Sequence, residues 1–263
     1  MDLKSKKISV IGLGYVGLPL AVAFAEKFQV IGYDIDQSRV KDLKSENDKT
    51  HEIPESSLKS IKDNISYTSS IKDIKDCNIF IITVPTPIDD ANRPDLTPLI
   101  KSSIAVGSVL KKDDIVIYES TVYPGTTEEV CLPILEESGL SFNKDFFLGY
   151  SPERLSPGIG GKKLHETVKI ISASNKKTLT VLEHIYGTIV DAGIHIAESI
   201  KVAEAAKVTE NIQRDVNIAL LNELYMLFET MDINTNQVIE AASTKFNFHH
   251  YVQGLVGGHC IGV

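Results

Sequence analysis

The chain has 263 residues, of which 43% are hydrophobic and 24% charged, and its formal net charge is −8. This is the composition of a soluble globular protein with one large domain or two modest ones. Lys and Arg form no cluster that could follow a phosphate backbone, so we expect no nucleic-acid partner. No apolar run reaches the roughly 18 residues that suggest a membrane-spanning helix, so we expect no membrane partner either.

The cysteines and histidines narrow the classes of protein further. Cys77, Cys131 and Cys260 are odd in number and far apart, which excludes a disulfide framework and a Cys-x-x-Cys metal site. The histidines lack the spacing of metal ligands, so no metal site is predicted. A reducing, cytoplasmic location fits this pattern. The basic and apolar N-terminus also resembles a secretory signal, but ordered glycines interrupt its apolar run.

The first half of the chain alternates buried strands with helices. Ile8–Leu13 is a continuous apolar run typical of a strand covered on both faces, and Tyr15–Phe28 has helical spacing. Gln29–Asp34 is then predicted to be a second strand. Such alternation predicts an α/β fold, a doubly wound, Rossmann-type parallel sheet with helices on both faces. Further strands are expected at Ile79–Val84, Asp114–Tyr118 and Phe146–Tyr150, and helices at Thr97–Leu110 and Thr126–Ser138.

The second half is expected to close the sheet and then to become helical. Ser199–Met231 keeps a helical period without Gly or Pro, and a helix this long usually links domains or packs against a partner subunit. We expect a Rossmann-type domain over residues 1–198 and an all-α region over 199–263. The other predicted elements are strands at Val168–Ser172 and Gly193–Ala197, helices at Lys176–Tyr186 and Thr235–Ser243, and a Gly-rich end at 253–263.

A glycine motif lies between the first predicted strand and helix. In Gly12-Leu-Gly14-Tyr-Val-Gly17, Gly12 would make the tight turn, Gly14 would let a pyrophosphate approach the backbone, and Gly17 would bring the helix close to the sheet. The helix N-terminus then favours the anion. Asp34 ends the second strand, where a carboxylate accepts hydrogen bonds from ribose hydroxyls. This context predicts a dinucleotide site, although the same glycines also suit a simple tight turn.

The acidic residue also bears on which dinucleotide is bound. A carboxylate at Asp34 would repel a 2′-phosphate, so the sequence favours NAD over NADP. Arg39 lies a few residues away and could receive such a phosphate, which leaves NADP as the alternative.

Polar motifs follow three of the predicted strands, at the edge of the sheet where this fold places its sites. They are Val84-Pro-Thr-Pro87, Glu119-Ser-Thr121 with Pro124-Gly-Thr-Thr127, and Ser151-Pro-Glu-Arg154. Each motif also suits ordinary turns. Because the motifs cluster at one edge of the predicted sheet, they favour a binding or catalytic site there.

The long helix and the C-terminal segment add further polar candidates. Lys207, Asn211 and Arg214 share one helix face, which is either a solvated stripe or a row of donors for a developing oxyanion. Cys260 follows His259 and several glycines that would let a substrate lie close to the backbone. A lone cysteine is more often buried and inert, as we expect for Cys77 and Cys131.

Together with Gly257-Gly-His-Cys260, these motifs resemble those of the UDP-sugar 6-dehydrogenase family, the UDP-glucose/UDP-mannose dehydrogenases, and they occur in the family's order. The run 210–220, with Tyr123-Pro-Gly125, is more similar to the branch that acts on UDP-N-acetylhexosamines than to the UDP-glucose enzymes. The resemblance implies a four-electron oxidation at C6, from alcohol to carboxylate, with two NAD in succession. It also implies a role in surface polysaccharide or capsule synthesis.

The resemblance also implies roles for individual residues. Cys260 would add to the C6 aldehyde, and hydride loss from the thiohemiacetal would leave a thioester. Lys207 and Asn211 would stabilise the oxyanions, and Thr121 and Glu153 would position and activate the hydrolytic water. The residues expected around NAD are Gly12, Gly14, Tyr15, Val16, Gly17, Asp34, Arg39, Val84, Thr86 and Thr121, and those around the UDP-sugar are Arg154, Lys207, Asn211, Arg214, Tyr251, Gly254 and Gly257.

Three departures from the family pattern are visible. Pro157 stands where many UDP-glucose enzymes have a second Glu, as expected of the acetylhexosamine branch. Gln253 replaces the usual Pro before Gly254, which predicts a less rigid substrate loop. These 263 residues hold neither the Asp expected after the cysteine segment nor the expected C-terminal UDP-binding domain, so we expect a chain truncated after Cys260.

Three functions therefore stay open. The first is an NAD-dependent UDP-N-acetylhexosamine 6-dehydrogenase, or a fragment of one, that forms a homodimer through the 199–231 helix. The second is a non-catalytic module that binds NAD and dimerises. The third is a β-hydroxyacid dehydrogenase, a class that shares the Rossmann domain and a helix lysine but does not need Cys260. The sequence does not distinguish the sugar's C2 and C4 stereochemistry.

Overall fold

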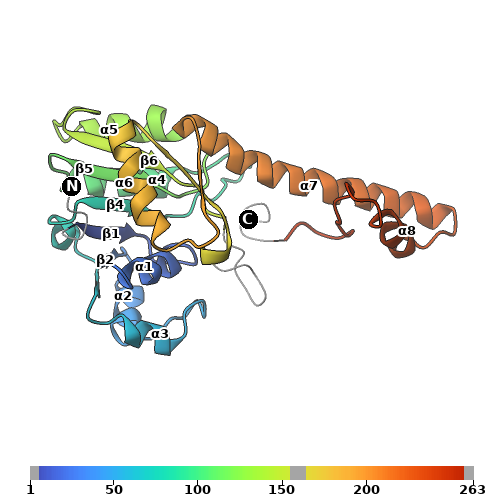
Figure 1. The fold of residues 1–263 in the computed structure, drawn as a ribbon, viewed down its shortest axis with the longest axis horizontal. Coiled ribbons are helices and arrows are strands. Elements are labelled where there is room, and N and C mark those ends of the chain that lie inside the picture. The colour runs from blue at the N-terminus through green and yellow to red at the C-terminus, as the bar shows by residue number, and fades with distance from the viewer. Residues whose placement is uncertain (1–5, 155–163, 258–263) are drawn as a thin grey trace. The chain divides into compact units, whose positions relative to one another are not determined.

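The computed structural model describes residues 6–154 and 164–257 (Figure 1). The chain divides into two compact units, one that ends at Lys207 and one that starts at Val208. Each unit is described by itself below. None of the helices in the described ranges is both long enough and apolar enough to cross a membrane.

The first unit begins with the predicted strand, helix and strand. They are β1 (Lys7–Ile11), α1 (Gly17–Ala25) and β2 (Gln29–Tyr33). The side chains of β1 from Ile8 to Ile11 are buried, and α1 buries residues on nearly all of its faces. A continuous apolar run therefore forms a strand covered on both faces, as predicted.

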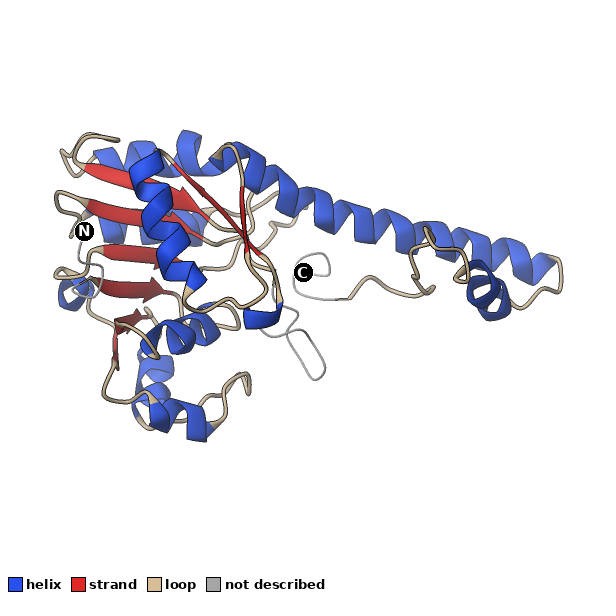
Figure 2. Ribbon diagram, viewed as in Figure 1, coloured by secondary structure: helices blue, strands red, loops and turns tan. Residues whose placement is uncertain are grey.

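The sheet has eight strands within the described residues, in the order β3-β2-β1-β4-β5-β6-β7-β8 (Figure 2). Because β2 and β3 extend to one side of β1 and β4 lies on its other side, the order reverses at β1. Ligands of open α/β sheets bind outside the carboxyl ends of the strands at such a point. The other strands are β3 (Ile65–Thr68), β4 (Ile79–Ile82), β5 (Asp114–Tyr118), β6 (Phe146–Tyr150), β7 (Lys169–Ala173) and β8 (Ile194–Ile196).

One strand departs from the prediction of a parallel sheet. β7 pairs with β6 in the antiparallel direction, with Gly149 opposite Ala173 and Tyr150 opposite Ser172. The remaining strand pairs are parallel. The chain between β6 and β7 contains only the short turn Leu164–Glu166 among its described residues, so no crossover helix of the parallel type is seen there.

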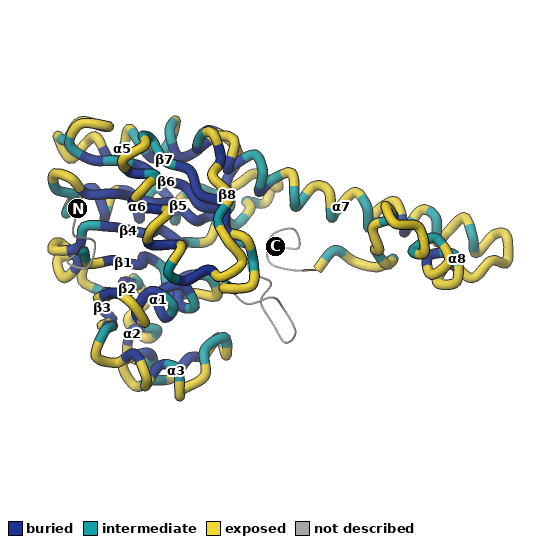
Figure 3. Tube along the Cα trace, viewed as in Figure 1, coloured by how far each residue is buried: buried dark blue, intermediate teal, exposed yellow. Residues whose placement is uncertain are grey.

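Two apolar clusters cover the two faces of the sheet, as the doubly wound prediction requires. The strands of the sheet are mostly buried (Figure 3). Leu18 and Phe24 of α1 lie in the same cluster as Leu182 of α6, and Leu99 of α4 lies with Leu135 of α5 in the other. Besides α1, this unit contains the helices α2 (Gln37–Lys44), α3 (Glu55–Ser60), α4 (Thr97–Gly107), α5 (Leu132–Glu136) and α6 (Lys176–Gly187), with shorter helical turns at Ile71–Ile74, Thr127–Cys131 and Leu164–Glu166.

The long helix α7 covers Ile200–Thr230, within one residue at each end of the predicted Ser199–Met231. Its first turns belong to the first unit, where Ile200 and Ala203 join the cluster of α4 and α5. In the second unit, α8 (Thr235–Ala242) follows α7, and the Asn222 side chain exchanges two hydrogen bonds of 2.8 and 2.9 Å with the backbone of Gly254.

Candidate active site

The glycine motif of residues 12–17 has the close packing that its sequence predicts. Gly12 has φ of +92°, which favours glycine at this turn. A Cβ at Gly17 would lie 1.8 Å from the carbonyl oxygen of Gly12 and 2.4 Å from Thr83 Oγ1, so only glycine fits there. At Gly14 a Cβ would meet nothing within 4 Å. The loop therefore packs tightly at its ends and leaves open space at its middle glycine.

Asp34 follows β2 and is held by two backbone donors. Its Oδ2 accepts from Leu13 N at 2.7 Å, inside the glycine motif, and its Oδ1 accepts from Asp36 N at 2.9 Å. A hydrogen bond thus connects the loop predicted to hold the pyrophosphate with Asp34, the residue predicted to bind the ribose.

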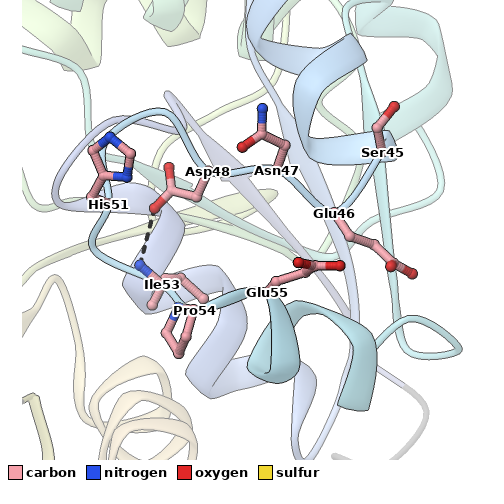
Figure 4. Close-up of a pocket in the computed structure, with 8 residues that line it drawn as sticks. All are labelled: Ser45, Glu46, Asn47, Asp48, His51, Ile53, Pro54 and Glu55. Atoms are coloured by element: carbon pink, nitrogen blue, oxygen red, sulfur yellow. Dashed lines mark hydrogen bonds between the residues drawn. The ribbon is translucent and has the colours of Figure 1, made fainter.

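Arg39 is already engaged by the protein. Its Nε donates to Leu13 O at 2.8 Å, and its guanidinium lies 2.8 Å from Asp48 Oδ1. Burial raises the pKa of Asp48, but hydrogen bonds from Thr50, the backbone and Arg39 outweigh it and hold the pKa below its ordinary value. Asp48 belongs to the lining of a pocket formed by residues 45–55, where it also accepts from Ile53 N (Figure 4). This ion pair argues against Arg39 as a free receptor for a 2′-phosphate.

Hydrogen bonds connect the loops that follow β1, β4 and β5. Thr83 Oγ1 donates to Gly12 O at 2.7 Å, and Ser120 Oγ donates to Val84 O at 2.6 Å. Thr86 Oγ1 donates to Thr121 O at 2.6 Å. The polar motifs that the sequence placed at separate strand ends therefore form one bonded edge of the sheet, next to the point where the strand order reverses.

The loop after β6 carries Glu153 and Arg154. Ser151 Oγ donates to Ile170 O at 2.7 Å, and Arg154 donates to Val168 O at 2.7 Å, so residues 151–154 are attached at both ends to the region where β7 starts. Glu153 is buried, with 8% of its surface exposed. The structure thus brings this motif to the same carboxyl edge as Thr121.

A buried ion pair beside this loop was not predicted. Lys169 Nζ lies 2.5 Å from Glu119 Oε2, and Tyr186 OH donates to the other carboxylate oxygen. Burial raises the pKa of Glu119 more than the neighbouring Lys169 lowers it. The signal in the sequence was a lysine at the head of an apolar strand, which is costly to bury without a partner.

Lys207, on α7, is the predicted oxyanion donor in the first unit. It is 6% exposed, and no hydrogen bond or ion pair joins it to another residue in the part of the chain that the structure describes. The Lys207 ammonium group is therefore mostly buried without a protein acceptor in that part of the chain.

The remaining predicted substrate residues lie in the second unit. Asn211 and Arg214 are half-buried on α7, and the Nε of Arg214 is buried without a hydrogen-bond partner there. Gly254 has φ of +146°, and Tyr251 is half-buried. Cys260 lies outside the described residues, so the predicted nucleophile is not tested.

Glu204, which the sequence did not single out, attaches α7 to the segment after Thr121. It is fully buried, and its two carboxylate oxygens accept from Gly125 N at 2.5 Å and Thr127 N at 3.0 Å. Thr127 N begins the helical segment Thr127–Cys131, and Gly125 N lies two residues before it, so both N–H groups are at a helix N-terminus, where a carboxylate is favoured. Glu204 therefore caps that segment from another helix.

Replacing Glu204 by alanine should lower the free energy of unfolding by about 2–4 kcal/mol, because two buried N–H groups lose their acceptor. Urea unfolding followed by circular dichroism measures this loss. Lys201→Ala is the matched control, since it removes an exposed ion pair with Glu129 and should leave the free energy of unfolding almost unchanged. Equal losses in the two variants would contradict the capping role.

Comparison with known proteins identifies related chains. Protein CapL of Staphylococcus aureus is 55% identical over 260 residues, which are 98% of this chain and 61% of CapL. The UDP-N-acetyl-D-glucosamine 6-dehydrogenase of Pseudomonas aeruginosa is 54% identical over 262 residues, 99% of this chain and 62% of that protein. Among solved structures, the UDP-D-ManNAc dehydrogenase of Pyrococcus horikoshii superposes with a TM-score of 0.90 at 36% identity, over 97% of this chain and 62% of that one.

The chain thus spans about three fifths of the length of these relatives. Residues 6–190 match the NAD binding domain of the UDP-glucose/GDP-mannose dehydrogenase family, and residues 201–263 match its central domain. Both the predicted family and the predicted NAD-binding Rossmann-type fold are confirmed. The chain belongs to the UDP-glucose/GDP-mannose dehydrogenase family.

Proposed function

We propose that the protein that carries this chain oxidises C6 of UDP-N-acetylglucosamine to the uronic acid with two NAD in succession. The observation that carries the proposal is the 54% identity, over 99% of the chain, to the Pseudomonas enzyme named for this sugar. The Pyrococcus protein named for the mannosamine sugar is only 36% identical. We therefore favour the glucosamine configuration within the acetylhexosamine branch.

The dinucleotide would bind over the glycine motif. The open space at Gly14 leaves room for a pyrophosphate, and Asp34 faces the same loop through its bond to Leu13 N. When bound, NAD supplies the hydride acceptor. The ion pair of Arg39 with Asp48 supports NAD over NADP, and Arg39 would then shape this end of the site by holding Leu13 O. The proposed lining of the NAD site also includes Gly12, Tyr15, Val16, Gly17, Val84, Thr86 and Thr121.

The sugar would be oxidised in two steps at one carbon. After the alcohol becomes an aldehyde, the Cys260 thiol adds to C6, and loss of a hydride from the thiohemiacetal leaves a thioester. Lys207 and Asn211 would donate to the oxyanion, and the unpartnered, buried ammonium of Lys207 supports this role. Thr121 and Glu153 would then hold and deprotonate the water that releases the acid. The sugar nucleotide would be bound by Arg154, Arg214, Tyr251, Gly254 and Gly257.

A second copy of the chain would pack along α7. Ile212, Val216 and Leu220 recur every four residues on this helix and are 56%, 58% and 54% exposed within the chain. An apolar strip of this kind suits a helix partner. A sedimentation mass equal to one chain would rule out the proposed homodimer. The cytoplasmic location and the surface-polysaccharide role stay predictions from the sequence.

The proposal is tested by NADH absorbance in the protein that carries this chain. UDP-N-acetylglucosamine should yield two NADH per sugar, with kcat/KM at least about 10-fold above that for UDP-N-acetylmannosamine, because one inverted substituent leaves polar groups unpaired. NADP in place of NAD should give little turnover. Binding of NAD without NADH formation from any UDP-acetylhexosamine would instead support the non-catalytic module.

A further inference from the structure

Arg39 lies beside the proposed dinucleotide site, and the protein engages all three nitrogens of its guanidinium. Nε donates to Leu13 O at 2.8 Å, Nη1 lies 2.8 Å from Asp48 Oδ1, and Nη2 donates to Thr50 Oγ1 at 3.4 Å. Apart from this ion pair, Nη1 is buried without a hydrogen-bond partner in the described residues. Only 10% of the Arg39 side chain is exposed. Arg39 is therefore a largely buried cation whose position depends on Asp48.

The loop of residues 45–55 fixes Asp48 for this ion pair. Its Oδ1 also accepts from the backbone and the hydroxyl of Thr50, at 3.0 and 2.7 Å. Its Oδ2 accepts from Glu52 N and Ile53 N at 3.0 Å each, and Figure 4 shows the second of these bonds. Burial raises the pKa of Asp48, but these hydrogen bonds outweigh it and hold the pKa below its ordinary value. Asp48 thus presents a fixed negative charge to Arg39 at neutral pH.

Leu13, inside the glycine motif, connects this ion pair with the proposed ribose ligand. Its N donates to Asp34 Oδ2 at 2.7 Å, and its O accepts from Arg39 Nε at 2.8 Å. Because the N and O of one residue lie within about 4 Å of each other, the carboxylate and the guanidinium are within about 10 Å. In this fold an arginine near the ribose ligand accommodates the 2′-phosphate of NADP. Arg39 is thus in the right neighbourhood for that phosphate but is held by other groups.

We propose that Asp48 is a second determinant of cofactor specificity, which disfavours NADP by keeping Arg39 on Leu13 O and away from the 2′-phosphate. The inference deepens the proposed binding of NAD over the glycine motif and rests on it. Asp34 would act directly, because its carboxylate repels a phosphate at the ribose. Asp48 does not touch the dinucleotide and acts through Arg39, so it is a positioning residue.

The burial of Asp48 makes an exchange of partners unfavourable for Arg39. If Arg39 turned to a phosphate, the Asp48 carboxylate would stay buried without its cation, and Leu13 O would lose a donor. The new ion pair would thus replace an existing one, so NADP gains little from the arginine. With a neutral side chain at position 48 the same movement breaks no ion pair. The guanidinium is then available for the paired hydrogen bonds that arginine makes to phosphate.

The test measures the dissociation constants of NAD and NADP by calorimetric titration in the protein that carries this chain. Asp34→Asn is the background, because it removes the direct repulsion and keeps an oxygen for Leu13 N. In this background, adding Asp48→Asn should lower the ratio of the NADP Kd to the NAD Kd by about 10-fold or more. Adding Arg39→Met as a third substitution should remove that gain, because the gain requires the guanidinium.

Glu55→Gln, in the same background, is the matched control. It removes one negative charge from the same loop, but its ion pair with Lys59 is exposed and does not involve Arg39. The ratio of the two constants should therefore change by less than about 2-fold, since salt screens an exposed charge. A change as large as that in Asp48→Asn would overturn the proposal, because the net charge of the loop would then explain both.

A second comparison tests the proposal without changing Asp48, in case Asp48→Asn does not fold. Arg39→Met is added to Asp34→Asn alone, where Asp48 still holds the arginine. An arginine that is held in this way contributes nothing to phosphate binding, so the ratio should stay within about 2-fold. A ratio that rises about 10-fold would show that Arg39 already binds the 2′-phosphate, which would overturn the proposal.

The remaining outcomes distinguish this inference from the proposed function. No binding of NAD by the unaltered protein would overturn the proposed NAD site itself. Normal NAD binding together with an unchanged ratio in the Asp34→Asn, Asp48→Asn protein would overturn only the role of Asp48. A gain in NADP affinity that persists after Arg39→Met would also overturn that role, because it would then arise without the arginine.

Discussion

Replacing Gly17 by alanine should lower the free energy of unfolding by more than about 3 kcal/mol and abolish NAD binding. The added methyl group would lie 1.8 Å from the carbonyl oxygen of Gly12 and 2.4 Å from Thr83 Oγ1, and the first of these is backbone that cannot rotate away. To relieve this steric clash, α1 would have to move away from β1, which would break the packing of Leu18 and Phe24 in the apolar cluster. Urea unfolding and calorimetric titration with NAD measure the two effects.

Gly14→Ala is the matched control for this prediction. Its methyl group would meet nothing within 4 Å and Gly14 does not have a positive φ, so stability should change by less than about 1 kcal/mol. The methyl group would nevertheless occupy the open space proposed for the pyrophosphate, and NAD affinity should fall about 10-fold or more. If both variants bind NAD normally, the glycine motif serves only as a tight turn.

Replacing Cys260 by alanine should remove steady-state formation of the uronic acid, with a loss in kcat of roughly 10⁴-fold or more. An aldehyde carbon cannot give up a hydride to become an acid derivative until a nucleophile adds to it, and alanine offers none. The variant should therefore release at most one NADH for each sugar it oxidises. Absorbance of NADH, together with separation of the sugar products, measures this ratio.

Cys77→Ala is the control for the thiol. Both other cysteines are fully buried, and burial raises the pKa of each thiol to about 11, so neither is suited to act as a thiolate. Cys77 lies just before β4 and should lose only its packing contribution when replaced. Two NADH per sugar from Cys260→Ala would show that another group supplies the nucleophile.

Long apolar patterns in the sequence predicted most of the fold. The run from Ile8 is typical of a buried strand, and the next apolar segment has the period of a helix, so β1, α1 and β2 were predicted within a few residues. The length of α7 followed from the absence of Gly and Pro over its span. Such patterns are sufficient to predict an element because the choice between a helix and a strand decides whether many apolar side chains are buried together.

Short polar elements were not predicted. In α2 (Gln37–Lys44) only Val40 and Leu43 are buried, and its start depends on the Asp36 side chain accepting from Ser38 N. The four-residue strand β3 (Ile65–Thr68) is likewise too short to show a period. The reversed direction of β7 depends on how the chain returns to β6, which local sequence does not encode.

The candidate site was predictable where its residues are close in sequence or follow neighbouring strands of the sheet. The glycine motif and Asp34 belong to one structural unit of known geometry, and the bond from Leu13 N to Asp34 shows them in contact. The pairing of Arg39 with Asp48 and that of Lys169 with Glu119 arise from tertiary packing. A charged residue in an apolar strand signals that a partner exists, but it does not say which residue the partner is.

The two bonds that Asp34 makes to Leu13 N and Asp36 N are to backbone groups of its own folded unit. The rotational entropy of this carboxylate is therefore lost when the chain folds, and an incoming dinucleotide does not have to order it again. The proposed reaction uses two NAD for each sugar, so NAD would bind twice in each catalytic cycle. A receptor whose recognition group is already aligned allows the spent cofactor to leave and its replacement to enter without refolding this loop.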